Sequence, residues 1–239
     1  MTAPRVEVQP DPGTLATAVA GELLSRLADA QAAGNDPHIA LTGGGIAEAV
    51  HRELARLSPE SGVDWSRVVV WWGDERFVAR DSADRNAKGA RAAFLDAVGA
   101  TQVHEMPSTD DAVDVDAAAT AYSAAVREHG AGEFEVVMLG LGPDGHVASL
   151  FPGHPALDDA GIAVGVSGSP KPPPERISLT FAALNRARSV WFLVSGEQKA
   201  TAVAAALAAE GDLHDIPARG VTGAEETIWF LDHDAASSI

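Results

Sequence analysis

The sequence predicts an α/β fold: a doubly wound, mostly parallel sheet with helices on both faces, of a modified Rossmann-like kind. From residue 38 onward, short apolar runs alternate with longer amphipathic segments, the pattern of repeated strand and helix units. The run at 134–139, with its Val-Val core, is typical of a strand covered on both faces. Several of the runs end in glycine loops, where open α/β sheets place their ligands. We expect one domain spanning residues 1–239.

Composition excludes several classes of function. The formal charge of −17, from 34 acidic and 17 basic residues, argues against a nucleic-acid partner, which needs a basic surface. No apolar run approaches the length of a membrane span, so we expect a cytoplasmic protein without membrane association. The chain has no cysteine, and its eight histidines show no metal-ligand spacing. We expect no metal, no cofactor, and a monomer or weak homo-oligomer.

The first two predicted helices flank a strand and a glycine loop. Residues 11–34 follow an Asp-Pro start and repeat apolar side chains at four-residue spacing. His38–Leu41 is a strand, and Thr42-Gly43-Gly44-Gly45 then opens a second helix. Backbone N–H groups and the positive end of a helix dipole would face an anion here. Alone the triplet is weak evidence and suits a plain turn, because it lacks the Rossmann spacing and the Walker lysine.

The next predicted strand, residues 68–72, runs into Gly73-Asp74-Glu75-Arg76-Phe77-Val78. Such a charged triplet usually lies in a solvated turn. Here two tryptophans precede it and two apolar residues follow it, so we expect at least one charge in a cleft. Residues 86–99 and 112–129 are predicted helices, separated by an irregular segment at 103–108.

A glycine-rich loop follows the strand Phe134–Leu139. Its glycines at 140, 142 and 145 permit tight turns and close approach of a ligand. Asp144 and His146 lie among them, so a carboxylate is two residues from an imidazole suited to proton transfer. The alternative is a turn histidine that fills space, with Asp144 as a turn residue that caps the loop.

The remaining elements continue the alternation. We predict a small helix at 147–150, strands at Ala163–Val166, 177–180, 189–194 and 227–231, and a short helix or tail at 232–239. Prolines stiffen the loop 169–176, which ends at Arg176. Lys199 lies in the first turn of a predicted helix, where the dipole disfavours a cation. A bound anion would offset that cost; an exposed lysine without a role is the alternative.

Three segments resemble the signatures of one enzyme family. GLGPDGHVASLFPG, residues 140–153, is similar to the signature of 6-phosphogluconolactonases, within a superfamily shared with glucosamine-6-phosphate deaminases. WGDERFV at 72–78 resembles a second signature and PKPPPERISLT at 170–180 a third. The blocks occur in the family's order over nearly the whole chain. The glycine loop departs from the family's Ser-Gly-Gly-Ser pattern at Gly45 and Ile46, which removes a hydroxyl donor.

The resemblance implies hydrolysis of 6-phospho-D-glucono-1,5-lactone to 6-phosphogluconate in the oxidative pentose phosphate pathway. It places Asp74 and Arg76 at active-site positions, Arg176 at a phosphate ligand and Asn86 at a recurrent asparagine. Because the loops 42–45, 73–78, 140–146 and 195–199 meet at the carboxyl edge of the predicted sheet, we expect one site there. Its expected catalytic residues are His146, Asp74, Arg76 and Asp144, and its expected substrate- and phosphate-binding residues are Thr42, Gly43, Gly44, Gly45, Arg176 and Lys199.

Two alternatives remain open. A glucosamine-6-phosphate deaminase or isomerase-like enzyme would use Asp74 to abstract a proton next to the carbonyl. Against it, Phe151 stands where the deaminases carry a ring-opening glutamate. A noncatalytic sugar-phosphate sensor could use the same pocket, but binding alone would not need an imidazole base.

Overall fold

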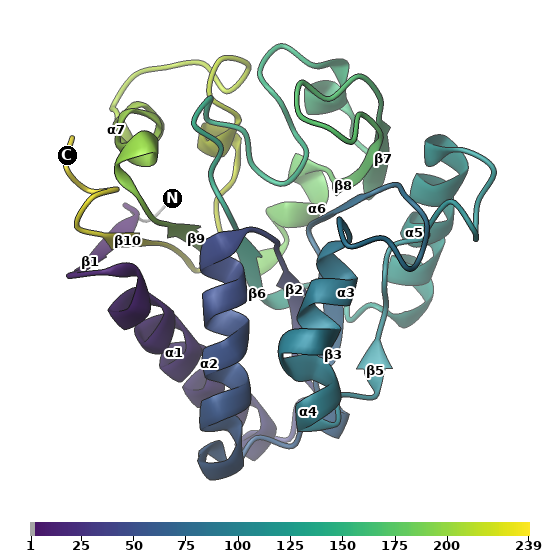
Figure 1. Ribbon diagram of the computed structural model, residues 1–239, viewed down its shortest axis with the longest axis vertical. Coiled ribbons are helices and arrows are strands. Elements are labelled where there is room, and N and C mark those ends of the chain that lie inside the picture. The colour runs from purple at the N-terminus through teal and green to yellow at the C-terminus, as the bar shows by residue number, and fades with distance from the viewer. Residues whose placement is uncertain (1–2) are drawn as a thin grey trace.

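The computed structural model describes residues 3–239. A seven-stranded sheet with the order β1-β10-β9-β6-β2-β3-β5 forms its centre, and all neighbouring strands in it are parallel (Figure 1). The strands are Arg5–Gln9 (β1), Glu226–Asp232 (β10), Ala187–Val194 (β9), Phe134–Leu139 (β6), His38–Leu41 (β2), Val69–Trp72 (β3) and Gln102–Val103 (β5). The predicted doubly wound, mostly parallel class is confirmed.

Helices connect the strands by crossovers that are right-handed in nearly all such sheets. α1, α2 and the α3–α4 segment stand side by side in front of the sheet (Figure 1). The helices are Pro12–Ala32 (α1), Gly45–Ser61 (α2), Asn86–Ala90 (α3), Asp96–Val98 (α4), Val115–His129 (α5), Phe181–Leu184 (α6) and Ala200–Leu207 (α7); a π-helical turn, Arg91–Leu95, joins α3 to α4, and short 3₁₀ turns cover Trp65–Arg67, Pro155–Asp158, Glu197–Lys199 and Pro217–Gly220.

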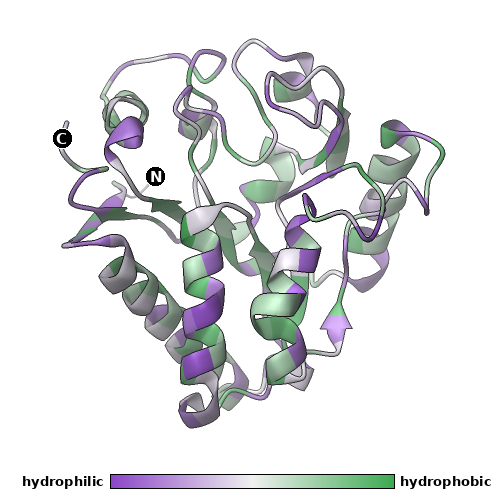
Figure 2. Ribbon diagram, in the orientation of Figure 1, coloured by the Kyte–Doolittle hydropathy of each residue, from purple (hydrophilic) through white to green (hydrophobic). Residues whose placement is uncertain are grey.

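Local chemistry explains where the main elements begin and what they bury. Asp11 caps α1 by accepting a hydrogen bond from the Thr14 backbone at 2.8 Å. The central strands of the sheet are apolar while the outward side of α2 is hydrophilic (Figure 2), as a helix covering a sheet requires. The short strand β5 pairs with Val69 and Val70 of β3. At the end of β3, the Tyr122 hydroxyl of α5 accepts a hydrogen bond from the Trp72 backbone N–H at 2.9 Å and donates one to the Trp72 carbonyl at 3.2 Å. No helix of the described part of the chain is long and apolar enough to cross a membrane.

The strand order reverses between β2 and β6. The chain leaves β2 toward β3 on one side, and it leaves β6 toward β9 on the other. Such a reversal opens a crevice at the carboxyl ends of the two strands, where ligands of open α/β sheets bind. The loops that begin there are 42–45 and 140–146, two of the four predicted to form the site.

A second sheet was not foreseen. Asp74–Arg76 (β4), predicted as a loop, pairs antiparallel with Arg176–Leu179 (β8), which pairs antiparallel with Ala163–Val166 (β7). The register places Asp74 opposite Ser178 and Arg76 opposite Arg176. A strand of three residues is too short to show an alternating pattern, so β4 could not be predicted from its residues. This sheet nevertheless carries two arginines and an aspartate to the crevice.

Other sequence-based elements need correction. Residues 147–150 form a tight turn closed by a hydrogen bond of 2.9 Å from the Leu150 N–H to the Val147 carbonyl, and not a helix. Ala148 has a φ of 49°, in the left-handed region that a right-handed helix cannot use. The edge strand β1 was missed because its side chains are mostly exposed and lack a buried apolar run. The end of the chain, 233–239, forms turns after β10, which is the tail alternative of the prediction.

Candidate active site

A cavity of about 270 Å³ lies at the carboxyl edge of the main sheet and brings most of the predicted residues together. Of the ten, those that line it are Thr42, Gly43, Gly44, Asp74, Arg76, His146, Arg176 and Lys199. Gly45 instead lines an adjoining cavity of about 380 Å³, which also contacts Gly43, Gly44 and Lys199. Asp144 does not line the cavity but lies against His146.

The imidazole of His146 is held by Asp144. Its Nδ1 lies 2.5 Å from Asp144 Oδ1, and the same oxygen is 3.4 Å from the His146 backbone N–H. The aspartate therefore caps the loop and also orients the ring. Burial raises the pKa of Asp144, but the hydrogen bond and charge of His146 outweigh that effect and bring the pKa to about 2. Gly142 is required beside this pair, because a Cβ there would overlap both side chains.

Phe151 lies between His146 and Arg176. The Phe151 ring centroid is 4.6 Å from the His146 ring centroid and 5.8 Å from the guanidinium carbon of Arg176. Phe151 is fully buried. The position that carries a glutamate in the resembling deaminases is thus an apolar support for the imidazole.

The strand β4 supplies the acidic side of the cavity. Asp74 is buried, and its Oδ2 accepts a hydrogen bond from Ser149 Oγ at 2.7 Å. Arg76 donates to the side-chain oxygen of Asn86 and to the Asp84 carbonyl at 3.1 Å. Asn86 donates in turn to the Asp74 carbonyl at 3.1 Å. The Asn86 side chain also abuts Gly43, where a Cβ would overlap it.

Glu75 connects strand β4 to the start of α3 through buried hydrogen bonds. Its carboxylate is fully buried and accepts backbone hydrogen bonds from Arg76, Asn86 and Ala87, each at 2.8 Å. Arg85, also buried, is its ionic partner at 4.0 Å. Burial raises the pKa of Glu75, although the three N–H donors and Arg85 favour its ionised form. Glu75 thereby fixes the start of α3 relative to β4.

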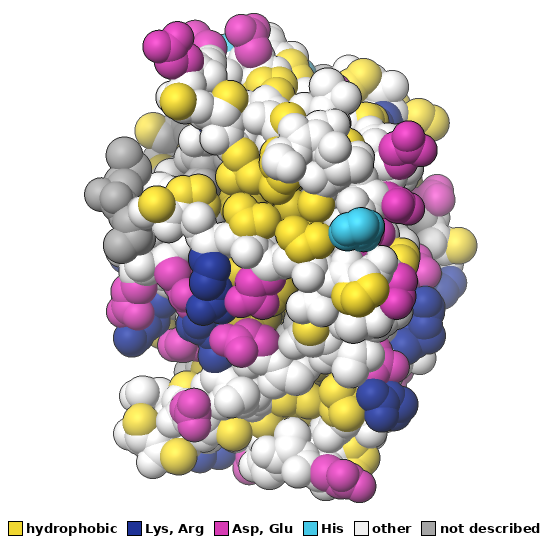
Figure 3. All heavy atoms as spheres, turned by 90° about the vertical axis from the view of Figure 1, so that its left-hand side faces the viewer, with side chains coloured by type: hydrophobic (Ala, Val, Ile, Leu, Met, Phe, Trp, Pro, Cys, Tyr) yellow, Lys and Arg dark blue, Asp and Glu magenta, His cyan; other side chains and the backbone are white. Residues whose placement is uncertain are grey.

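Cationic side chains gather around the cavity in an otherwise acidic protein. Arg76, Lys171, Arg176 and Lys199 all line it. Lys199 Nζ donates to the Leu141 carbonyl at 2.6 Å, and burial followed by the charge of Lys171 lowers the Lys199 pKa. The face that carries β1 differs: acidic and basic side chains interleave there (Figure 3), and Arg26 pairs with Glu22 and Glu226.

Arg176 holds the proline loop in place. Its guanidinium donates to the carbonyls of Lys171, Pro172 and Pro173 at 3.1 to 3.3 Å. These bonds fix the segment that brings Lys171 to the cavity. Burial lowers the pKa of Arg176, while the charge of Asp74 opposes that change.

Sequence reasoning undervalued three residues. Asn86 and Lys171 line the cavity, although the resemblance pointed only to Asn86 and neither was among the ten expected site residues. Ser149 contacts Asp74 from a turn that was predicted as a helix. The signal for Asn86 was its match to a recurrent family asparagine, at the position where α3 begins.

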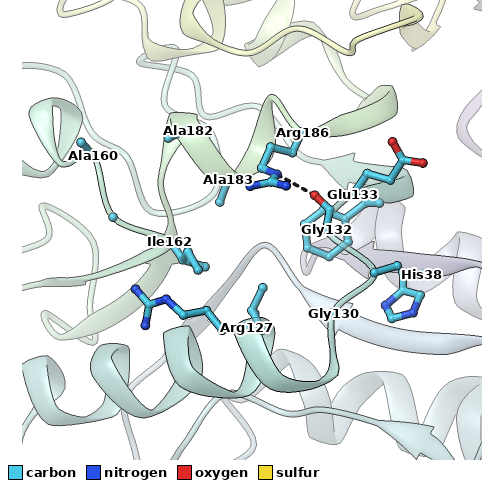
Figure 4. Close-up of a pocket in the computed structure, with 14 residues that line it drawn as sticks. His38, Arg127, Gly130, Gly132, Glu133, Ala160, Ile162, Ala182, Ala183 and Arg186 are labelled. Atoms are coloured by element: carbon cyan, nitrogen blue, oxygen red, sulfur yellow. Dashed lines mark hydrogen bonds between the residues drawn. The ribbon is translucent and has the colours of Figure 1, made fainter.

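A further cavity of about 330 Å³ lies near the amino ends of β2 and β6, and none of the ten predicted residues lines it. Figure 4 shows Arg127 and Arg186 on its border, with the Arg186 guanidinium donating to the Gly132 carbonyl at 2.6 Å. Within residues 3–239 no group of three or more histidine, aspartate or glutamate side chains is arranged to hold a metal ion.

A switch-point crevice lined by glycine amides, cations and an oriented imidazole is suited to an enzyme that binds an anionic ligand and transfers protons. Residues 10–229 match the family described as glucosamine-6-phosphate isomerases/6-phosphogluconolactonase. The chain belongs to this family, and the predicted resemblance is confirmed. The 6-phosphogluconolactonase of Streptomyces coelicolor is 43% identical over 99% of this chain and 95% of its own length. That of Mycobacterium tuberculosis is 43% identical over 98% of both chains.

Solved structures agree with this placement. The structure named devB protein superposes with a TM-score of 0.87 at 29% identity, covering 98% of this chain and 99% of that one. The 6-phosphogluconolactonase of Trypanosoma brucei gives a TM-score of 0.82 at 26% identity over the full length of both chains. A monomeric glucosamine-6-phosphate deaminase gives 0.83 at 18% identity over 98% and 100% of the two chains, which shows a shared fold alone.

Proposed function

We propose that the protein is a 6-phosphogluconolactonase, which hydrolyses 6-phospho-D-glucono-1,5-lactone to 6-phosphogluconate in the oxidative pentose phosphate pathway. The observation that carries the proposal is His146, held by Asp144 in a cavity with four cationic side chains. Relatives at 43% identity over nearly the full chain carry the same name. The substrate is a cyclic ester with a phosphate, and these side chains match its two chemical parts.

In the proposed mechanism His146 transfers the proton in both directions. A water molecule attacks the lactone carbonyl carbon while the neutral imidazole takes a proton from that water, and the carbonyl oxygen becomes an oxyanion. Arg76 or backbone N–H groups of the glycine loops stabilise that charge. The bond between the carbonyl carbon and the ring oxygen then breaks, and the imidazolium returns the proton to the departing alkoxide. Asp74 accepts hydrogen bonds from the sugar hydroxyls or from the water.

The phosphate would be held on the cationic side of the cavity. Thr42 to Gly45 offer backbone N–H groups at the start of the 17-residue helix α2. Arg176, Lys171 and Lys199 add positive charge within the same cavity. Because the net charge of −17 repels an anion at long range, this local cluster has to supply the attraction; salt screens the long-range repulsion over about 8 Å. Phosphate binding would thus orient the lactone toward His146.

Phe151 favours the lactonase over an amino-sugar deaminase. A buried phenyl ring against His146 has no proton to exchange, so it cannot take the part of the ring-opening glutamate. A sensor without turnover would not require the oriented imidazole.

The direct test follows the loss of freshly generated 6-phosphogluconolactone with a coupled 6-phosphogluconate dehydrogenase assay. We expect the protein to exceed the spontaneous rate clearly and to release no ammonia from glucosamine 6-phosphate. Ammonia release would support the deaminase instead, and tight binding of the sugar phosphate without turnover would support the sensor.

A further inference from the structure

A strained turn between His146 and Phe151 presents a buried hydroxyl to the active-site carboxylate. Ser149 is fully buried, and Ala148 before it has a φ of 49°, a conformation that costs free energy for a residue other than glycine. The Ser149 backbone N–H donates to Ser178 Oγ at 3.2 Å. The side-chain hydroxyl of Ser149 donates separately to Asp74 Oδ2 at 2.7 Å.

The other oxygen of Asp74 is differently placed. Among residues 3–239, Ser149 is the side chain that donates to the Asp74 carboxylate, and it uses Oδ2. Asp74 lines the cavity, and within residues 3–239 its Oδ1 accepts no hydrogen bond. An aspartate carboxylate rotates easily about its terminal torsion. One directed hydrogen bond therefore decides which oxygen faces the substrate.

We propose that Ser149 is a positioning residue that fixes the Asp74 carboxylate so that Oδ1 accepts hydrogen bonds from the sugar hydroxyls. The inference rests on the proposed function, in which Asp74 contacts the sugar. Ser149 does not touch the substrate; it acts through Asp74. The turn thus connects His146, the proposed base and acid, to Asp74, which would orient the sugar.

Other charges near Asp74 do not replace this contact. Arg176, on the paired strand, acts on Asp74 through charge, and it uses three of its N–H groups on the carbonyls of the proline loop. Arg76 is engaged by Asn86 and Asp84. His146, Lys171 and Lys199 border the same cavity, but none donates a hydrogen bond to Asp74 within the described chain.

The test is a double-mutant cycle read by binding of 6-phosphogluconate, the reaction product, in a calorimeter. Binding is chosen because spontaneous lactone hydrolysis hides weak turnover. The proteins are wild type, Ser149→Ala, Asp74→Ala and the double variant. We expect Ser149→Ala to raise Kd about fivefold when Asp74 is present, the scale of one hydrogen bond, and less than twofold when residue 74 is alanine. Ser178→Ala is the matched control, because it removes a buried hydroxyl of β8 that contacts the same turn but leaves the Ser149–Asp74 bond; its Kd should stay within twofold.

A second variant guards against loss of folding. Ser149→Cys keeps the size of the side chain but has only a weak donor, so its Kd should follow that of Ser149→Ala, and thermal melts of all variants should show a folded protein. An equal rise in Kd with and without Asp74, or an equal rise for Ser178→Ala, would overturn the inference while leaving the lactonase proposal intact. A wild type that neither binds 6-phosphogluconate nor accelerates lactone hydrolysis would overturn both.

Discussion

The carboxylate of Asp144 lies 2.5 Å from Nδ1 of His146 and orients its ring from behind. A carboxylate accepts hydrogen bonds, so the neutral imidazole carries its proton on Nδ1 and keeps the lone pair on Nε2. Within the described chain, Nε2 has no hydrogen-bond partner, and the ring borders the cavity. This is the arrangement that a base acting on water requires.

Asp144→Ala should lower kcat about 100-fold, because the ring loses the group that fixes its tautomer and orientation. With a pKa of about 2, Asp144 remains ionised from pH 4 upward, and its pairing is lost only as the pH falls through that value. Asp212→Ala is the matched control: Asp212 Oδ1 contacts His214 Nδ1 at 3.0 Å with the same two-residue spacing, outside the cavity. Equal losses of kcat for Asp144→Ala and Asp212→Ala in the coupled assay would contradict the role of Asp144.

Lys199→Ala should raise KM for the phosphorylated lactone about tenfold and leave kcat nearly unchanged, because it removes a charge that binds the phosphate in both ground and transition states. The rate on unphosphorylated gluconolactone should not change. Lys88→Ala, at an exposed lysine that donates to the Asp81 carbonyl outside the cavity, should behave as wild type. If Lys199→Ala affected both lactones equally, the phosphate role would be wrong.

Glu75→Gln should lower the free energy of unfolding by about 1–3 kcal/mol, because the new amide group places a donor against one of three backbone N–H donors in a buried site. Urea unfolding would measure the loss. Glu210→Gln, at an exposed residue, should change it by less than about 0.5 kcal/mol. Equal stability of the two variants would contradict the buried network.

His51 should make stability fall with acidification. Burial, and then the charge of Arg52, lowers its pKa from 6.5 to about 4, and its Nδ1 has no partner in the described chain. Between these values the unfolded chain binds a proton that the folded chain does not, so the free energy of unfolding drops as pH falls from 6.5 toward 4, by roughly 3 kcal/mol at most. In His51→Leu, the pH dependence of the free energy of unfolding, measured by urea unfolding at several pH values, should correspond to nearly one bound proton fewer than in wild type. An unchanged slope would show that His51 is not the source.

The sequence was sufficient where long periodic elements or whole motifs carried the signal. Apolar runs predicted β2, β3, β6, β9 and β10, and the four glycine or charged loops predicted where the cavity lies. It failed at β4 and at the turn 147–150, because a three-residue strand has no readable period and a left-handed Ala148 has no residue signature. The contacts of Ser149 and Phe151 depend on that turn. Asp144 could not be assigned to the ring or to the loop until their distances were known.

The most direct measurement compares wild type with His146→Ala in the coupled assay on freshly generated 6-phosphogluconolactone, with the spontaneous rate subtracted. The proposed mechanism predicts clear acceleration by wild type, a rate near background for the variant, and nearly equal binding of 6-phosphogluconate by both. A variant that retains most of the wild-type rate would contradict His146 as the base, and a wild type no faster than background would contradict the lactonase itself.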